Sequence, residues 1–162
     1  MKASQRLSLV AGCLLMVAPL AARASEPAQA FLDGLRERKL HDVALDYLDS
    51  LANNPSVPAA FKETLTYEKG VTLISGAKFQ RDTVLREKQL DEGHKTLQQF
   101  ITSQPSHLLA VSARTQLGNV IVERARIKVE RAKKLTPDEK QKLHVEAQAL
   151  YAEAAKVFAA LV

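Results

Sequence analysis

The residues of this chain that could perform chemistry are four histidines and one cysteine, and none of them lies in a pattern typical of an active site or a metal site. Zinc sites built on a helix use two histidines three or four residues apart, or an HExxH motif, and neither occurs. Serines and carboxylates occur without the glycine-rich turns of nucleophile elbows or phosphate loops. We therefore predict no catalytic residue, no metal and no cofactor, and expect polar surface or helix-cap positions for His41, His94, His107 and His144.

The densest basic segment is 123–134, ERARIKVERAKK, in which positive and negative side chains alternate. Such alternation is typical of a solvent-exposed helix. The alternative, which we do not favour, is a patch that meets an anionic membrane surface such as phospholipid head groups. Because the segment has no aromatic side chain for stacking on bases, we predict no nucleic-acid partner.

Residues 1–24 have the organisation of a signal peptide for export. A positively charged start precedes an apolar run over 7–18, and the small residues Ala22 and Ala24 form the expected cleavage site. The run is shorter than the roughly 20 residues that a transmembrane helix needs, so an uncleaved anchor is only the alternative. The mature protein is expected to begin at Ser25 and to be periplasmic.

Cys13 offers a second interpretation of the same segment. The sequence Val10-Ala11-Gly12-Cys13 resembles the lipobox of bacterial lipoproteins, in which the cysteine becomes an acylated first residue. We favour cleavage after Ala24, since the lipobox would leave a long apolar tail on the mature protein. Three of the 23 basic residues are then removed, and the remaining 20 basic and 18 acidic residues nearly balance, which gives no indication of a nucleic-acid partner.

Apolar residues recur at three- and four-residue steps along 25–162, without strand alternation, so we predict one all-α domain of about six helices. Proline, asparagine and glycine punctuate this periodicity. The last helix is expected to begin at Thr136, where Glu139 can close a capping box. The breaks between the helices are expected at 38–41, 53–58, 75–82, 104–107 and near 135. A helix that continues through 75–82 is the alternative at that position.

Three segments share one pattern, in which a small residue is followed by a large apolar residue four positions later and by another three positions after that. These are Ala44, Leu48 and Leu51 before a proline; Gly93, Leu97 and Phe100 before Pro105; and Ala154, Phe158 and Leu161. The pattern resembles the tetratricopeptide repeat. That resemblance implies that the small residue admits the preceding helix, the aromatic packs between helices and the proline closes the unit. The helices would then stack as antiparallel hairpins in a tetratricopeptide-like α-solenoid; a helical bundle without repeats is the alternative.

An exported chain of this kind is similar in style to the group of repeat proteins that includes the Tol-Pal envelope factor and outer-membrane assembly lipoproteins. The resemblance implies a non-enzymatic periplasmic scaffold that binds other envelope proteins or peptides in a concave groove. One alternative is the N-terminal helical domain of a larger cell-envelope enzyme whose catalytic part lies beyond residue 162. Because the last helix reaches Val162 without a stop signal, we expect further repeats after it, or self-association through that helix.

We predict that the exported protein begins at Ser25, because export signals of this type are removed after the small-x-small site. N-terminal sequencing of the protein recovered from a periplasmic fraction checks the prediction. An intact Met1, or an acylated Cys13 as the first residue, would contradict it.

Overall fold

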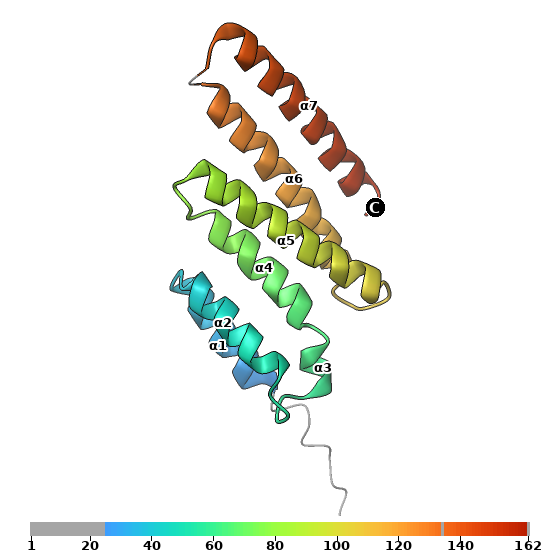
Figure 1. Ribbon diagram of the computed structural model, residues 1–162. Helices are drawn as coiled ribbons and strands as arrows, with labels where there is room; N and C mark the ends of the chain where they lie inside the picture. The colour runs from blue at the N-terminus through green and yellow to red at the C-terminus, as the bar shows by residue number, and fades with distance from the viewer. Residues whose placement is uncertain (1–24, 134, 162) are drawn as a thin grey trace, which may run out of the picture.

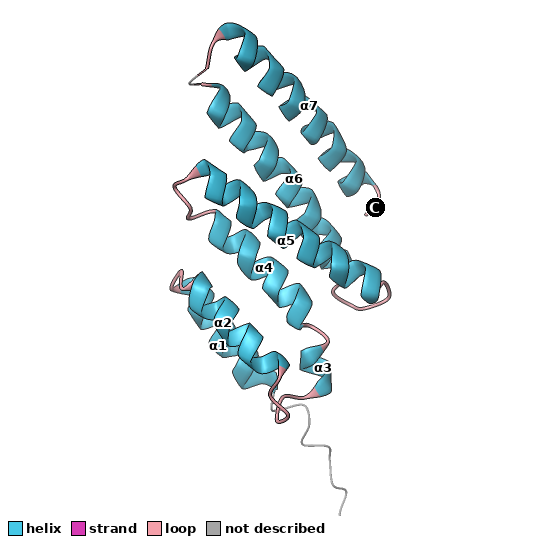
Figure 2. Cartoon of the chain, viewed as in Figure 1, coloured by secondary structure: helices cyan, strands magenta, loops and turns pink. Residues whose placement is uncertain are grey.

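The computed structural model describes residues 25–133 and 135–161, and within these ranges the chain forms seven α-helices and no strand (Figure 1, Figure 2). The prediction of an all-α fold is confirmed. The segment 1–24, with the expected cleavage residues Ala22 and Ala24, lies outside the described residues. The helices are α1 Ser25–Glu37, α2 His41–Ala52, α3 Ala59–Lys62, α4 Leu65–Ala77, α5 Thr83–Ser103, α6 Ala110–Ala132 and α7 Pro137–Ala159.

The expected breaks at 53–58 and 75–82 leave one helix between them, and this expectation is wrong, because the structure divides the segment into α3 and α4. At the break the N–H of Thr64 donates to the carbonyl of Phe61 at 3.0 Å, one residue nearer in the chain than an α-helix requires. The Thr64 hydroxyl donates to the same carbonyl at 2.8 Å. A local hydroxyl bond of this kind competes with the helical hydrogen-bond pattern. The additional short helix gives seven helices in the described ranges instead of about six.

Side-chain hydrogen bonds define the start of α5 and of α7, each of which follows an expected break. The carboxylate of Asp82 accepts hydrogen bonds from the N–H groups of Val84 and Leu85, at 2.7 and 3.2 Å, and so caps α5. Before α7, the N–H and the hydroxyl of Thr136 both donate to the carboxylate of Glu139, at 3.2 and 2.7 Å. These bonds pair backbone donors that a helix start would otherwise leave to solvent.

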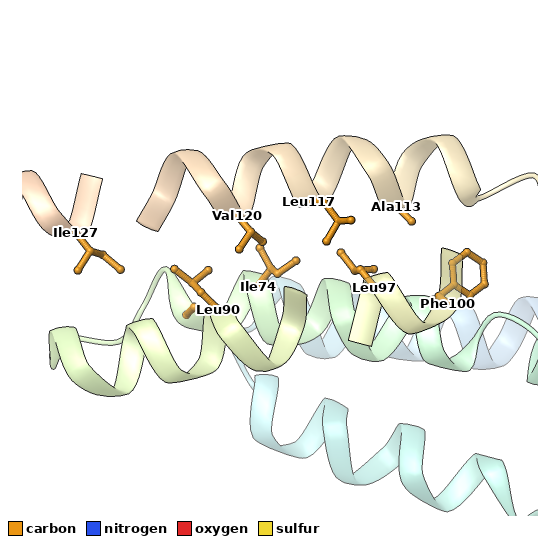
Figure 3. Close-up of a cluster of buried hydrophobic side chains, with 9 residues drawn as sticks. Ile74, Leu90, Leu97, Phe100, Ala113, Leu117, Val120 and Ile127 are labelled. Atoms are coloured by element: carbon orange, nitrogen blue, oxygen red, sulfur yellow. The ribbon is translucent and has the colours of Figure 1, made fainter. Parts of the chain in front are cut away.

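Neighbouring helices pack side by side, and the molecule extends from α1 at one end to α7 at the other (Figure 1). Helix α2 packs on α4, α4 on α5, α5 on α6 and α6 on α7. The larger apolar core lies between α4, α5 and α6, where Leu97 of α5 faces Leu117 of α6 (Figure 3). A smaller core joins α1 to α2 through Leu32, Leu35, Ala44 and Leu48.

Helices α4 and α5 approach each other closely at Gly70 and Gly93. A Cβ atom on Gly93 would lie 2.8 Å from Cγ1 of Ile74 and 3.3 Å from the carbonyl oxygen of Gly70. A Cβ atom on Gly70 would lie 2.7 Å from side-chain carbons of Leu97. Because 2.7 and 2.8 Å are shorter than carbon atoms tolerate, a side chain at either position would force Leu97 or Ile74 to shift.

A buried ion pair joins the first hairpin to α4. Arg36 of α1 donates to the Glu68 carboxylate at 2.7 Å and to the Glu68 carbonyl at 2.8 Å. It also donates to the Thr72 hydroxyl at 2.7 Å. The Arg36 and Glu68 side chains are only 14% and 9% exposed, so each charge has lost most of its contact with water and is stabilised by the other. Nearer the surface, Lys69 of α4 pairs with Asp49 of α2 at 2.8 Å.

The expectation that 123–134 is solvent-exposed is wrong at Ala125, Ile127 and Ala132, which are buried on two different sides of α6. Four charged residues of this segment are also used in packing, because they pair with neighbouring helices. These pairs are Arg124 with Asp91 at 2.9 Å, Lys128 with Glu146 at 2.7 Å, Glu130 with Arg86 at 2.8 Å and Arg131 with Glu87 at 3.2 Å.

Helix α7 packs on α6 through the Phe158 ring. A Cβ atom on Gly118 would lie 2.6 Å from two carbons of that ring, so glycine leaves the space that the ring fills. Ala154 is buried in the same contact zone, while Leu161 is half-buried. The aromatic side chain therefore anchors the last turns of α7 against the middle of α6.

We predict that Gly93→Ala lowers the free energy of unfolding by about 1–3 kcal/mol, because the added methyl group overpacks the contact between α4 and α5. The control is Gly34→Ala, where the nearest atom to a new Cβ would be the movable Nη1 of Arg38 at 3.1 Å. That substitution should raise stability by up to about 1 kcal/mol through helix propensity. Urea unfolding measures both values, and a stabilising Gly93→Ala would contradict the assigned contact.

Candidate functional site

Two hollows lie on the face that α2, α4 and α5 form together. The first lies beside the N-terminal half of α4 and has a mixed apolar, hydroxyl, amide and charged lining. Its walls come from two successive hairpins, so no single stretch of sequence contains it. The lining residues are Leu48, Asp49 and Ala52 of α2; Leu65, Thr66 and Lys69 of α4; and Glu92, Thr96 and Gln99 of α5.

The second hollow lies at the opposite end of α4, beside the turn that leads into α5. Because α2 and α5 both run antiparallel to α4, the hollows follow one another along it, ten residues or about 15 Å apart as measured from Thr66 to Gly76. We call the two together the α2–α4–α5 groove. The second hollow is lined by Lys39, His41, Asp42, Leu45, Gly76, Phe79, Gln80 and Gln89.

Lys39 closes α1 in the left-handed conformation, with φ of 62°. Its N–H donates to the carbonyl of Arg36 at 2.9 Å, and the N–H of Leu40 donates to the carbonyl of Leu35 at 3.0 Å. This is the Schellman arrangement, in which glycine or asparagine is usual at the left-handed position. The Lys39 ammonium lies 4.8 Å from the centre of the Phe79 ring and so links the two hairpins at the end of the groove. The residue that makes this contact has an unfavourable backbone conformation.

His41 is buried, and the expectation of a polar surface position is wrong for this residue. It is 6% exposed, and its ring stacks on that of Phe79 with 5.3 Å between the ring centres. Burial lowers the pKa of His41, and the charge of Arg36 lowers it further, while the Lys39 carbonyl and Asp42 act in the opposite direction. The imidazole is therefore held in its neutral form at neutral pH.

Two other histidines serve local structure. Burial lowers the pKa of His94 in α5, and the nearby guanidinium of Arg124 lowers it further. His107 accepts a hydrogen bond at Nδ1 from the N–H of Leu109, at 3.0 Å, in the turn before α6. Within the described ranges, no group of three or more histidine, cysteine, aspartate or glutamate residues is arranged to hold a metal ion.

Gln89 lines the second hollow, and its side chain carries a buried acceptor atom. Its Oε1 atom is shielded from solvent and has no hydrogen-bond partner among the residues that the structure describes. A Cβ atom on Gly76 would lie 3.2 Å from the Gln89 amide nitrogen and 3.1 Å from Cβ of His41. Glycine at position 76 therefore lets the amide of α5 reach the second hollow close to α2.

Of the residues predicted to pack the repeats, only Leu48 lines the groove. The groove residues themselves were missed, because they come from three helices and the turns beside them, and no single stretch of sequence contains them. Phe79 is the exception that a local signal could have found, since it is an aromatic side chain within the polar break 75–82. Of the predicted packing residues, Ala44, Leu48, Leu51, Gly93, Leu97, Phe100 and Ala154 are buried, Phe158 and Leu161 are half-buried, and Pro105 is exposed in the turn after α5.

Comparison of the chain with protein-family models, with curated proteins and with solved structures finds no match. Among the helices of the described ranges, none has both the length and the apolar character needed to span a membrane. The geometry and chemistry of the groove are therefore the basis on which a function can be proposed.

We predict that the free energy of unfolding falls as the pH is lowered from 7.5 to 5.5. In the folded protein the pKa values of His41 and His94 lie below the ordinary 6.5. At a pH between the lowered and the ordinary pKa, the unfolded chain therefore binds more protons than the folded protein does. Their contribution is thus complete above pH 6.5 and is lost as the pH falls through the lowered values. Urea unfolding across this range should show a smaller pH dependence for the double variant His41→Gln, His94→Gln; an unchanged dependence would rule out these residues as its source.

Proposed function

We propose that this protein is a non-enzymatic scaffold of tetratricopeptide-like helical hairpins, exported to the periplasm, that binds a segment of another envelope protein in the α2–α4–α5 groove. The observation that carries the proposal is the groove itself. Its walls are helices of two successive hairpins, and its lining combines apolar side chains with hydroxyl, amide and charged groups. Sites that bind another molecule commonly combine apolar surface with a few placed polar groups in this way.

The repeat character of the proposal is supported by two equivalent contacts. Leu97, four residues after Gly93 in α5, lies against Gly70 of α4. Phe158 holds the same place in its pattern, four residues after Ala154 in α7, and its ring lies against Gly118 of α6. In these two hairpins the large residue of the second helix thus packs over a glycine of the first helix, which agrees with the close helix approach that the tetratricopeptide resemblance implies.

The export part of the proposal is supported by the sequence of residues 1–24, with its charged start, apolar run and Ala22-x-Ala24 site. The groove adds no preference for nucleic acid, because its charged lining residues are both acidic and basic. A protein segment, which offers apolar side chains and main-chain polar groups together, suits a lining of this composition better than a purely anionic ligand does.

The proposal predicts that the full 162-residue chain selects peptides from a displayed library of random 12-residue sequences. Binding of the selected peptides, measured by fluorescence anisotropy, should weaken at least tenfold, or about 1.4 kcal/mol, in Gln99→Arg, because the long charged side chain fills the first hollow. The matched control is Gln98→Arg, which adds the same charge to the neighbouring residue of α5, outside the groove lining. Failure to select any peptide, or equal binding by both variants, would refute the proposed site.

A further inference from the structure

We infer that one edge of the molecule, formed by the α1–α2, α4–α5 and α6–α7 turns, docks on an anionic phospholipid bilayer. The inference does not rest on the function proposed above. Three observations carry it, namely the alignment of the turns, their positive charge, and the large apolar side chains exposed beside that charge. We call this surface, residues 38–40, 78–85, 133 and 135, the basic edge.

The three turns lie side by side. They follow one another along one edge of the molecule, on the left in Figure 1, whereas the connections 53–58 and 104–109 lie along the opposite edge. The Lys39 ammonium lies 4.8 Å from the centre of the Phe79 ring, which joins the first turn to the second. Thr83 at the start of α5 and Leu135 line one small hollow, which joins the second turn to the third. A row of adjoining turns suits a flat partner, because a flat surface can touch all three at once.

The basic edge is positively charged at its turns. Among the described residues of 38–40, 78–82 and 133–136 there are five exposed basic side chains and one acidic side chain, that of Asp82, which caps α5. In the described part of the chain none of the five forms an ion pair. The connections at the opposite edge, 53–58 and 104–109, contain no lysine, arginine, aspartate or glutamate. The five basic residues are Arg38, Lys39, Lys78, Arg81 and Lys133.

The helix dipole does not account for this distribution of charge. It stabilises a basic side chain near the C-terminal end of any helix, and the basic turns do follow α1, α4 and α6. At the opposite edge, however, α2 and α5 have no basic residue in the last turn and are followed by Asn53 and Gln104. Helices α3 and α7 have one each, Lys62 and Lys156. Because the dipole acts at every helix end, the excess at one edge indicates a partner there.

Each of the three turns also exposes a large apolar side chain within two residues of its basic residues, and the first turn of α5 adds two more. These side chains are 41–66% exposed, and they are five of the eleven exposed large apolar residues in the described ranges: Leu40, Phe79, Val84, Leu85 and Leu135. Exposed apolar side chains gathered in one place indicate a surface that a partner covers. At a bilayer, basic side chains attract the anionic head groups while apolar side chains enter the boundary of the acyl chains.

The basic segment 123–134 is a different surface. Three of its basic side chains, Arg124, Lys128 and Arg131, pair with acidic side chains of neighbouring helices. These three charges already have partners within the protein. Of the basic residues that the structure describes in this segment, Lys133 belongs to the basic edge.

Acidic side chains next to the basic edge limit the strength of head-group attraction. They belong to the adjoining turns of α1, α2 and α7, and they are Glu37, Asp42, Asp138 and Glu139. Binding should therefore need the apolar contact as well as the charge, and it should weaken as salt screens the charge. A bilayer that contains anionic lipid supplies both, whereas a soluble anion supplies only the charge.

The basic edge adjoins the groove without coinciding with it. Lys39 and Phe79 belong to both, so docking would place that end of the α2–α4–α5 groove at the bilayer surface. Lys78, Arg81 and Lys133 line neither hollow. Variants of these residues therefore test the edge while leaving the groove lining intact.

The test uses tryptophan as a reporter, since the chain contains none. In the full chain, Leu135→Trp places the reporter at the basic edge, and the control Leu108→Trp places it at the opposite edge, where Leu108 is also exposed. With vesicles of equal parts phosphatidylglycerol and phosphatidylcholine, fluorescence of Leu135→Trp should shift to shorter wavelength and be quenched by brominated acyl chains. Fluorescence of Leu108→Trp should do neither. Phosphatidylcholine alone should bind at least about tenfold more weakly.

Both reporter proteins carry residues 1–24, so binding of vesicles by the apolar run 7–18 does not by itself favour Leu135 over Leu108. Leu85→Trp, at the same edge, is the second reporter if Leu135→Trp does not fold. Equal quenching of the reporters at the two edges, or equal binding to the two kinds of vesicle, would overturn the inference. A blue shift without vesicles that grows with protein concentration would make a second copy of the chain the occupant and would overturn it as well.

A matched pair of double variants then tests the charge. In the Leu135→Trp protein, Lys78→Gln with Arg81→Gln should weaken vesicle binding about tenfold or more, because each basic residue near an anionic surface adds to the attraction. Lys95→Gln with Lys156→Gln removes the same charge from exposed positions of α5 and α7 outside the edge, and it should leave binding unchanged. An equal loss in both double variants would refute docking by this edge. Peptide selection by the groove is measured separately, so the proposed function stands or fails independently.

Discussion

The contact between α4 and α5 at Gly70 and Gly93 is the constraint on which the rest of the structure depends. It brings Ile74 of α4 into the same core as Leu97 of α5, and α6 then covers that core from the other side (Figure 3). Gly76 lies six residues after Gly70, on a different face of the helix, where it admits His41 of α2. Helix α4 therefore has Gly70 at its contact with α5 and Gly76 at its contact with α2. These two glycines allow α2 and α5 to pack closely on either side of α4, where they form the walls of the groove.

The two walls are attached to α4 by different forces. The α5 wall belongs to the large apolar core, whereas the α1–α2 hairpin has its own small core, against which Leu65 of α4 packs. This hairpin also meets α4 through two ion pairs, Arg36 with Glu68 and Asp49 with Lys69. A buried ion pair contributes little net stability compared with an apolar contact of the same size, but it tolerates few alternative geometries. The polar attachment thus fixes where the α2 wall stands relative to α4, which matters more for a binding groove than for the stability of a core.

Helix ends, and the all-α class itself, could be predicted from the sequence because their causes are local. Asp82 and Thr136 cap helices through residues within three positions, and Pro105 ends a helix through its own ring. The break at Thr64 and the burial of His41 could not be predicted, since the first replaces one local hydrogen bond by another of similar strength and the second depends on Phe79, which is remote in sequence. The groove lining depends on three helices at once, so only the arrangement of those helices reveals it.

Lys39 makes a contact at the end of the groove while adding little to the stability of the fold. At a left-handed position glycine would be favoured over lysine by about 1 kcal/mol, because a side chain there crowds the following carbonyl. The ammonium of Lys39 over the Phe79 ring returns about 0.5–1 kcal/mol, as cation–π contacts at exposed sites do. The two effects nearly cancel, so stability gives no reason to prefer lysine at this corner. What glycine could not supply is the contact itself, which keeps Phe79 at the end of the groove, over the ring of His41 and beside the amide of Gln89.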